Sequence, residues 1–160
     1  IYATGFQWMA TATFNMVTGR GGLTLRDKWK NEGVRTFLGL HSHGFPNLLI
    51  MSGPQGGGGQ FNFTRGIEGH TDYVVWMLQT MRDQGAAVVD IRKQPEDDYA
   101  AHCAEADTRT RPLRDCVSYY NGEGNAAPGS LAYYGSPRKW HELRQDAQAT
   151  LAPYVFQPAA

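Results

Sequence analysis

The chain has 160 residues, and its 15 basic and 15 acidic side chains give a formal net charge of zero. A chain of this length can form one domain with a hydrophobic core, and its balanced charge gives no broad electrostatic reason to bind nucleic acid or an anionic membrane. No apolar run approaches the roughly 20 residues that cross a bilayer, so neither nucleic acid nor a membrane is expected as a partner.

The two cysteines and the first residues suggest the setting of the protein. Cys103 and Cys116 do not make a disulfide framework. A disulfide between them is one alternative, but reduced, partly buried thiols are preferred, and the protein is therefore expected to be cytoplasmic. The segment 1–6 has no initiator methionine and reads as a strand entered halfway, so we expect a C-terminal piece of a longer polypeptide.

The first half of the chain predicts short strands separated by glycine-rich turns. Strands are expected at 1–5, 11–18, 22–25, 35–40 and 47–52, with the second and third forming a hairpin around 19–22 and a loop at 41–46. Thr24 can cap a single helical turn over 25–29. The run at 47–52 is apolar, as a strand covered on both faces should be.

The second half predicts helices and one further strand. A long helix can begin at Thr64 or at Thr71, since Gly66 and Gly69 weaken its first turns, and it ends at Gly85. The apolar face expected for this helix consists of Val74, Val75, Leu78 and Met81.

A strand is expected at 86–91, followed by a helix from Pro95 to about residue 106. An irregular region at 108–135 ends at Ser136, where a last helix begins. The side of this helix that faces the core is expected to carry Trp140, Leu143, Ala147 and Leu151. The alternation of strand, glycine loop, helix, strand and helix predicts an α/β chain.

The glycine-rich stretch at 53–64 is the strongest sign of a ligand site. Gly56 to Gly59 carry no Cβ, so a flat ligand can approach the backbone closely. The helix that follows offers unpaired N–H groups and the positive end of its dipole to negative charge. The stretch predicts a cradle for a cofactor edge. A dinucleotide fingerprint is absent, because the nearest glycine match, at 122–127, is followed by Pro128 where a helix should begin. A Walker A loop is absent too, because no Gly-Lys-Ser/Thr follows the glycine run.

Other residues that could carry chemistry have a structural interpretation that we prefer. His41, His43 and His70 could supply metal ligands, but no cysteine or carboxylate lies at ligand spacing, so no metal site is expected. Ser52 lacks the flanking glycines of a nucleophile elbow, which makes serine hydrolase chemistry a poor explanation. The acidic pair 97–98 is expected to face solvent near a helix start.

Aromatic pairs leave two interpretations open. The tyrosines at 119–120 and 133–134 could stack on a cofactor ring, or they could pack in the core of an irregular segment, and residue type alone favours neither. Lys28 and Trp29 are expected to be structural, with the indole covering a seam of the domain.

Several segments share their order and spacing with one known family. They are Ile-Tyr-Ala-Thr-Gly-Phe at 1–6, Gly-Arg-Gly-Gly-Leu-Thr-Leu-Arg-Asp-Lys-Trp at 19–29, Leu-Gly-Leu at 38–40, Gly-Phe-Pro-Asn-Leu at 44–48 and Gly-Pro at 53–54. Together they resemble class B flavin monooxygenases, and among these the Baeyer–Villiger monooxygenases that act on cyclohexanone, phenylacetone and cyclopentadecanone. The resemblance covers nearly the whole chain and is strong to about residue 78.

The resemblance implies the C-terminal part of a flavoprotein with two dinucleotide-binding domains, which uses FAD, NADPH and O₂ to insert oxygen beside the carbonyl of a ketone. It implies that residues 1–92 end the FAD-binding, Rossmann-like domain, with a hinge strand at 1–6, and that 93–160 form a helical extension with a substrate and cofactor loop. The family's glycine-rich nucleotide motifs and its catalytic arginine would lie upstream. No catalytic residue is therefore expected in this chain, which would need the missing N-terminal part of the same polypeptide as its partner.

The resemblance also implies roles for particular residues. Those expected to contact FAD are Gly53, Pro54, Asn62, Phe63 and Thr64. Those expected near NADPH are Ala3, Thr4 and Gly5. Those expected beside the substrate are Gln60, Phe61, Tyr119 and Tyr120, and the form of the sequence at 119–124 implies a bulky cyclic or steroid ketone. Two alternatives remain: a related oxygenase acting on nitrogen or sulfur, and a non-catalytic FAD scaffold.

Overall fold

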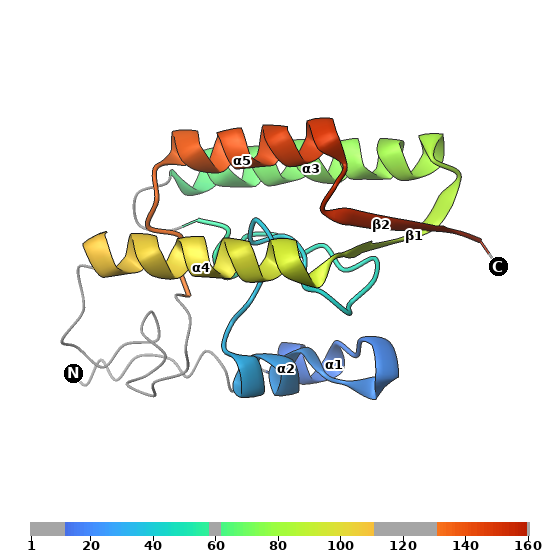
Figure 1. Ribbon diagram of the computed structural model, residues 1–160, viewed down its shortest axis with the longest axis horizontal. Coiled ribbons are helices and arrows are strands. Elements are labelled where there is room, and N and C mark those ends of the chain that lie inside the picture. Colours follow the sequence, from blue (N-terminus) through green and yellow to red (C-terminus); the bar gives the residue numbers. More distant parts are fainter. Residues whose placement is uncertain (1–11, 58–61, 111–130, 160) are drawn as a thin grey trace.

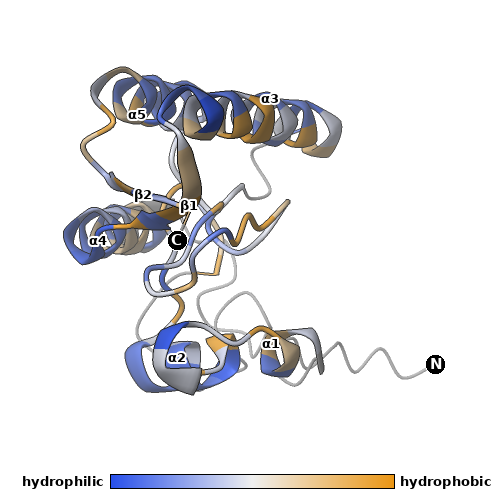
Figure 2. Ribbon diagram, turned by 90° about the vertical axis from the view of Figure 1, so that its right-hand side faces the viewer, coloured by the Kyte–Doolittle hydropathy of each residue, from blue (hydrophilic) through white to orange (hydrophobic). Residues whose placement is uncertain are grey.

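The computed structural model describes residues 12–57, 62–110 and 131–159 (Figure 1). Its elements are α1 (Ala12–Met16), the 3-10 turn η2 (Arg20–Gly22), α2 (Leu25–Glu32), α3 (Phe63–Asp83), β1 (Ala86–Ile91), α4 (Lys93–Thr110), α5 (Pro137–Thr150) and β2 (Tyr154–Pro158). Helices α3 and α5 lie side by side over the two strands, and α1 and α2 lie at the opposite end of the molecule (Figures 1 and 2). None of the helices in the described ranges is long and apolar enough to cross a membrane.

The two strands form one antiparallel ribbon. Ile91 pairs with Tyr154 and Ala86 with Pro158, with an irregularity near the start of β1. The strand at 86–91 is confirmed, whereas β2 is missing from the elements expected from the sequence. In the described residues the fold therefore combines helices with few strands, and the several strands expected for an α/β sheet are reduced to this ribbon.

The main core lies between α3, α4, α5 and the ribbon. Its buried members include Tyr73 and Met77 of α3, Cys103 of α4 and Trp140 of α5. Cys103 is a free thiol, and burial raises its pKa to about 12, so it behaves as a small apolar side chain. A second cluster around Trp29 packs α2 against the following loop, which agrees with the structural role expected for that indole.

Two strands expected in the first half are wrong because the backbone turns there. Leu38 and Gly39 have φ of 58° and 73°, so the segment 35–40 reverses direction, and only Phe37 and His41 form a bridge. The segment 47–52 is bounded by Asn47 and Ser52, whose φ values of 59° and 53° also prevent an extended strand. Apolar side chains in both segments pack inward from turns.

Asn47 takes up the ladder positions that a neighbouring strand would fill. Its backbone N–H donates to the carbonyl of Val89 at 2.9 Å, and its Oδ1 accepts from the N–H of Val89 at 2.9 Å. Its Nδ2 donates to the carbonyl of Ala87 at 3.0 Å. One asparagine thus satisfies the free edge of β1 at these positions.

The hairpin expected at 11–25 is confirmed only as a reversal of the chain. Residues 12–16 are helical in α1 and not extended, and a single bridge joins Thr18 to Thr24 across η2. Thr24 caps α2 as expected, since its side chain accepts from the N–H of Asp27, but the helix continues to Glu32.

Helix α3 begins earlier than either expected start. Asn62 is its N-cap, with the side-chain oxygen accepting from the N–H of Arg65. The last helical residue is Asp83, and Gly85, two positions on, closes the helix as expected with a φ of 60°. Its expected apolar face is only partly correct: Met81 packs against the core, but Val75 and Leu78 are 49% and 57% exposed. The buried residues are His70, Tyr73 and Met77. Polar ring atoms lower the apparent hydrophobicity of His70 and Tyr73, which concealed this face in the sequence.

The last two helices agree better with the sequence. Helix α4 begins two residues before Pro95 and runs to Thr110, beyond the expected end. Helix α5 is confirmed at its start, where Ser136 caps the N–H of Lys139. On α5, Trp140 and Ala147 are buried, and Leu143 and Leu151 pack against the same core.

Candidate functional site

The turn at residues 52–56, before α3, is called the glycine turn, and a buried glutamine fixes its centre. The side chain of Gln55 is fully buried, and its Oε1 accepts from the N–H of Thr36 at 3.0 Å and from the hydroxyl of Thr36 at 2.8 Å. Its Nε2 donates to the carbonyl of Val34 at 3.0 Å. Because both ends of the amide are bonded, the turn is attached to the segment 34–36.

A histidine of α3 bridges the two ends of the same turn. The N–H of Ser52 donates to Nδ1 of His70 at 3.2 Å, and Nε2 of His70 lies 3.1 Å from the carbonyl of Gly56. Burial is the main cause that lowers the pKa of His70. The nearby charge of Arg144 lowers the pKa further, and the bond to Gly56 acts in the opposite direction. The ring is therefore held in its neutral form at ordinary pH.

Backbone contacts complete the support of the turn. The hydroxyl of Tyr99, on α4, donates to the carbonyl of Gln55 at 2.7 Å. The N–H of Gln55 donates to the carbonyl of Leu131 at 2.9 Å, and the N–H of Tyr133 donates to the carbonyl of Gly57 at 3.3 Å. The turn is thus bonded to α3, to α4 and to the segment that precedes α5.

The turn also lies against the backbone of Gly39. A Cβ added to Gly39 would lie 2.0 Å from Cα of Gly56. The φ of 73° at Gly39 is likewise one that side chains disfavour, so this position requires glycine for two reasons. The two turns can approach each other only because neither carries a side chain at the contact.

The start of α3 presents an open surface beside this rigid turn. Asn62 and Thr64 are exposed and Phe63 is 71% exposed, whereas Pro54 is buried and Gly53 is half-buried. The cap from Asn62 to the N–H of Arg65, at 3.0 Å, satisfies one of the helix's first amides. The five residues expected to contact FAD therefore lie on a supported turn and on an accessible helix end.

The other expected site residues lie outside the described residues. They are Ala3, Thr4 and Gly5, expected near NADPH, and Gln60, Phe61, Tyr119 and Tyr120, expected beside the substrate. Of the tyrosine pairs with two open interpretations, 133–134 packs in the interior: Tyr133 is fully buried and stacks on Tyr99 with ring centroids 6.1 Å apart.

A groove of about 590 Å³ extends from the start of α3 along α5. Asn62 lines one part of it and Trp140, His141 and Arg144 line another. The Arg144 guanidinium donates to the carbonyl of Gly69 at 2.7 Å and lies 3.0 Å from Nδ1 of His141. The bond to Gly69 joins α5 to α3, and the contact with His141 lies within α5.

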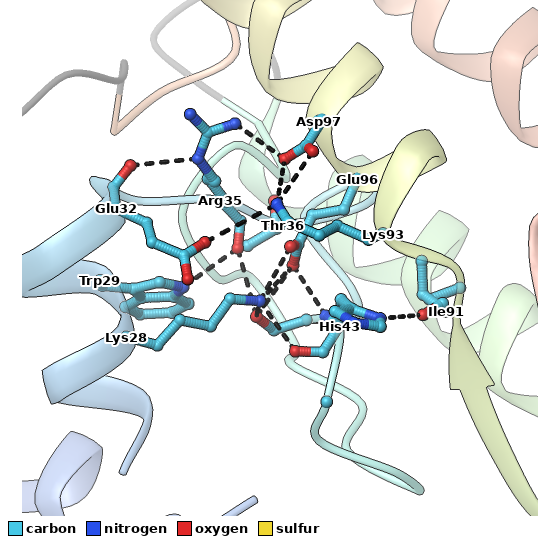
Figure 3. A network of polar contacts seen from close by, with 12 residues as sticks. Lys28, Trp29, Glu32, Arg35, Thr36, His43, Ile91, Lys93, Glu96 and Asp97 are labelled. Carbon is cyan, nitrogen blue, oxygen red and sulfur yellow. Dashed lines mark hydrogen bonds and ion pairs between the residues drawn. The ribbon is translucent and has the colours of Figure 1, made fainter. Parts of the chain in front are cut away.

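A buried ion pair joins α2 to α4 and was not expected from the sequence. Lys28 and Glu96 are 4% and 0% exposed, and Nζ of Lys28 lies 2.8 Å from both carboxylate oxygens (Figure 3). The ammonium also donates to the Ser42 hydroxyl at 2.9 Å and to the His43 carbonyl at 2.8 Å. Glu96 accepts in addition from the N–H of His43 at 2.7 Å. Both charges are saturated with partners, so this pair joins α2, the loop and α4 and offers no free acid or base.

The acidic pair at the start of α4 is divided between two environments. Asp98 is exposed, as expected, but Asp97 is half-buried and bonds Arg35 at 2.9 Å and Lys93 at 2.9 Å (Figure 3). These bonds and charges lower the pKa of Asp97 and outweigh its burial, which acts in the opposite direction.

The three histidines considered as metal ligands have separate partners. Nε2 of His41 lies 2.9 Å from the hydroxyl of Tyr73, which lies 2.6 Å from that of Tyr154. Complete burial lowers the pKa of His41 to about 3. His43 bonds the carbonyl of Ile91 through Nδ1 at 2.6 Å, and His70 belongs to the glycine turn. Within the described ranges, no group of three or more potential ligands could hold a metal ion.

No family model matches the chain. A Baeyer–Villiger monooxygenase of Streptomyces coelicolor is 33% identical over 159 residues, which cover 91% of this chain and 26% of that protein. The phenazine N-monooxygenase PhzNO1 of Lysobacter antibioticus is 27% identical over 160 residues, covering 98% of this chain and 29% of that protein. The chain therefore spans about a quarter of the length of the curated relatives it matches.

Solved structures show the same arrangement of elements. A structure described as an OTEMO complex with FAD and NADP matches with a TM-score of 0.77 and 23% identity, over 98% of this chain and 30% of that one. That structure contains FAD and NADP. The sequence relatives define the chain as related to flavin-dependent monooxygenases. Within that class, the chain belongs to the Baeyer–Villiger monooxygenase family.

Proposed function

We propose that these residues form the C-terminal, flavin-edge portion of an FAD- and NADPH-dependent Baeyer–Villiger monooxygenase, which converts ketones to esters or lactones with O₂. The relative from Streptomyces coelicolor supports the reaction class, and the FAD and NADP of the OTEMO complex support the cofactors. In this proposal residues 1–92 end the FAD-binding domain and 93–160 form the extension that packs back onto it.

The observation that carries the proposal is the rigid glycine turn beside an open helix start. The turn is bonded through Gln55 and His70 to parts of the chain far away in sequence, while Phe63 remains 71% exposed. A supported backbone next to an exposed apolar ring is suited to receive the edge of a flat, partly apolar ligand.

The residues at the helix start fit an anionic edge of FAD. The first N–H groups of a helix have no partner within it, and Asn62 satisfies only the N–H of Arg65. Amides near Phe63 and Thr64 can therefore stabilise negative charge that develops at the flavin edge, assisted by the dipole of α3. When bound, FAD supplies the redox chemistry between NADPH and O₂. The chain's own part is to orient that edge and exclude water from it.

The remaining assignments extend the same proposal. Ala3, Thr4 and Gly5 would approach NADPH. The substrate space would be bordered by Gln60, Phe61, Tyr119 and Tyr120, and the ketone in it would be a bulky cyclic or steroid ketone. No catalytic residue is assigned within the chain, and acceleration of the reaction would depend on residues of the longer polypeptide.

The test uses the full-length protein that contains these residues. Purified protein should be yellow, oxidise NADPH faster when a cyclic ketone is added, and release a lactone whose yield depends on NADPH. A colourless protein, or a lactone yield unchanged when NADPH is omitted, would refute the proposal.

Two helix caps provide a matched pair of variants. Asn62→Ala and Ser136→Ala each remove a side-chain cap, the first from α3 and the second from α5. Each should reduce stability by about 1 kcal/mol. Only Asn62→Ala should weaken retention of FAD, measured by dialysis and absorbance. Equal retention in the two variants would show that the start of α3 lies away from the flavin.

A second candidate is oxygenation of a ring nitrogen, which the likeness to phenazine N-monooxygenase favours. The same holoenzyme would then form an N-oxide from a heteroaromatic amine and no ester from ketones. FAD binding without NADPH oxidation in the presence of either substrate would instead indicate a non-catalytic scaffold.

A further inference from the structure

Among the described residues, the ring of His70 is the side chain that bonds both ends of the glycine turn. It accepts from the N–H of Ser52 at 3.2 Å, and it lies 3.1 Å from the carbonyl of Gly56. These two backbone groups enclose Gly53 and Pro54, which the proposed function places at the flavin. The ring thus determines the separation of the two ends of the segment that would meet FAD.

The two contacts define which nitrogen carries the proton. An amide N–H can only donate, so Nδ1 must be bare where it faces Ser52. A carbonyl can only accept, so Nε2 must carry the proton that it shares with Gly56. Only the neutral ring protonated at Nε2 makes both bonds. A doubly protonated ring would direct an N–H at the N–H of Ser52 and lose that bond.

The ring has no room to rearrange around these bonds. His70 is 2% exposed, and it packs against Trp140 of α5 with ring centroids 5.4 Å apart. A Cβ built on Gly56 would lie 3.1 Å from Cε1 of the ring, which shows how closely the turn covers it. The charged side chain facing it from α5 is Arg144, whose guanidinium bonds the carbonyl of Gly69. The turn itself contributes only backbone groups at the two bonds.

A second, independent support separates the role of His70 from folding. Gln55 holds the middle of the turn through Thr36 and Val34, and these bonds involve no titratable group. Loss of the ring's bonds should therefore loosen the ends of the turn while its centre stays attached.

We propose that His70, as a neutral ring with its proton on Nε2, is the positioning residue that sets the shape of the turn 52–56, and that protonation of the ring releases the turn and weakens FAD binding. The part that concerns FAD rests on the proposed function. Buried between the turn and α5, beside a cation, the ring keeps its pKa below the ordinary value, so the release occurs on the acid side of pH 6.5.

The test compares two variants with one control in the full-length protein. His70→Phe keeps a ring but no nitrogen. His70→Asn keeps an oxygen near the position of Nδ1 and cannot titrate. His41→Phe is the control, because His41 is also fully buried against α3 yet bonds Tyr73 and not the turn.

FAD affinity is measured from pH 5 to pH 8 by fluorescence titration. In the wild-type protein and the control, Kd should rise by about tenfold for each pH unit below the pKa of the ring, because only the neutral form is competent. His70→Phe should bind at least about tenfold more weakly at pH 8 and lose this pH dependence, since it lacks hydrogen bonds to both ends of the turn. His70→Asn should recover much of the affinity but not the pH dependence. An acid-side loss of affinity that persists in both His70 variants would overturn the proposal.

Hydrogen exchange distinguishes this inference from the proposed function. Exchange is measured by mass spectrometry with and without FAD. The peptide that contains Ser52 should exchange faster in His70→Phe than in the wild type, and its exchange rate in the His41→Phe control should equal that of the wild type. Faster exchange in His70→Phe than in the wild type, when the wild-type protein itself binds no FAD, would support the bridge and refute the proposed function. Unchanged exchange in His70→Phe would refute the bridge.

Discussion

The buried pair of Lys28 and Glu96 allows the most quantitative prediction. Their exposed fractions are 4% and 0%, and the ammonium lies 2.8 Å from both carboxylate oxygens. Lys28→Met would leave Glu96 charged and buried, with only two neutral donors, the N–H of His43 at 2.7 Å and the hydroxyl of Ser42 at 3.0 Å. Breaking a pair of this kind costs about 3–5 kcal/mol, because the surviving charge loses its compensation. We expect a loss of that size in the free energy of unfolding.

The assay is urea unfolding followed by tryptophan fluorescence, which Trp29 reports from the next position in α2. Arg138→Met is the control: its pair with Glu142 has a similar length of 3.0 Å, but the side chains are 88% and 45% exposed. That loss should stay below about 1 kcal/mol.

Removing both buried charges at once gives the decisive comparison. Lys28→Met with Glu96→Gln should be more stable than Lys28→Met alone, because no uncompensated carboxylate remains. If Lys28→Met costs no more than the surface control, or if the double variant loses the sum of the two single losses, the reasoning is wrong.

Three further predictions follow from burial and backbone geometry. Burial lowers the pKa of His41 from 6.5 to about 3, so below pH 6.5 the unfolded chain binds a proton that the folded protein does not. The free energy of unfolding should therefore be unaffected by this group above pH 6.5 and fall by up to about 1.4 kcal/mol per pH unit below it. His41→Phe should reduce that slope in urea midpoints taken at pH 7 and 5, and parallel slopes would contradict it. Gly39→Ala should cost about 3 kcal/mol or more, against about 1 for Gly85→Ala, since both have positive φ but only the former places a methyl group 2.0 Å from another backbone. Similar thermal midpoints would disprove the contact. Met77→Ala should lose about 2–5 kcal/mol and Leu78→Ala under about 0.5, as they are 0% and 57% exposed; the reverse order in urea would restore the face expected from the sequence.

The elements with strong local signals could be predicted from the sequence. Ser136 followed by proline defined the start of α5, and the β-branched run at 86–91 defined β1. Thr24 was identified as the cap of α2. Such features depend on residues within one turn of each other, so a single sequence contains them in full.

The failures arose where an apolar run serves a turn. The segments 35–40 and 47–52 have strand-like composition, but Leu38 and Asn47 adopt positive φ. Both have partners far along the chain: the carbonyl of Leu38 accepts from Trp140, and the N–H of Asn47 donates to the carbonyl of Val89. Nothing within six residues of Leu38 or Asn47 identifies these distant partners.

The candidate site was found only as a stretch of backbone. The glycines and the start of α3 carried a sequence signal, and the order of motifs identified the family, which the comparisons confirm. The supporting residues were not found, because Gln55 meets Thr36 across 19 positions and Glu96 meets Lys28 across 68. His70 was considered only as a metal ligand. Long-range polar pairing leaves no spacing to recognise.

Asn47 has a consequence for how this molecule avoids self-association. An unpaired strand edge invites other chains to add to it and begin aggregation. Here the side chain and the backbone N–H of Asn47 bond the edge groups of Val89 and Ala87. An incoming strand therefore finds no unpaired backbone group at these positions. A single polar residue thereby prevents strand addition at these positions of β1, on the edge that faces away from β2.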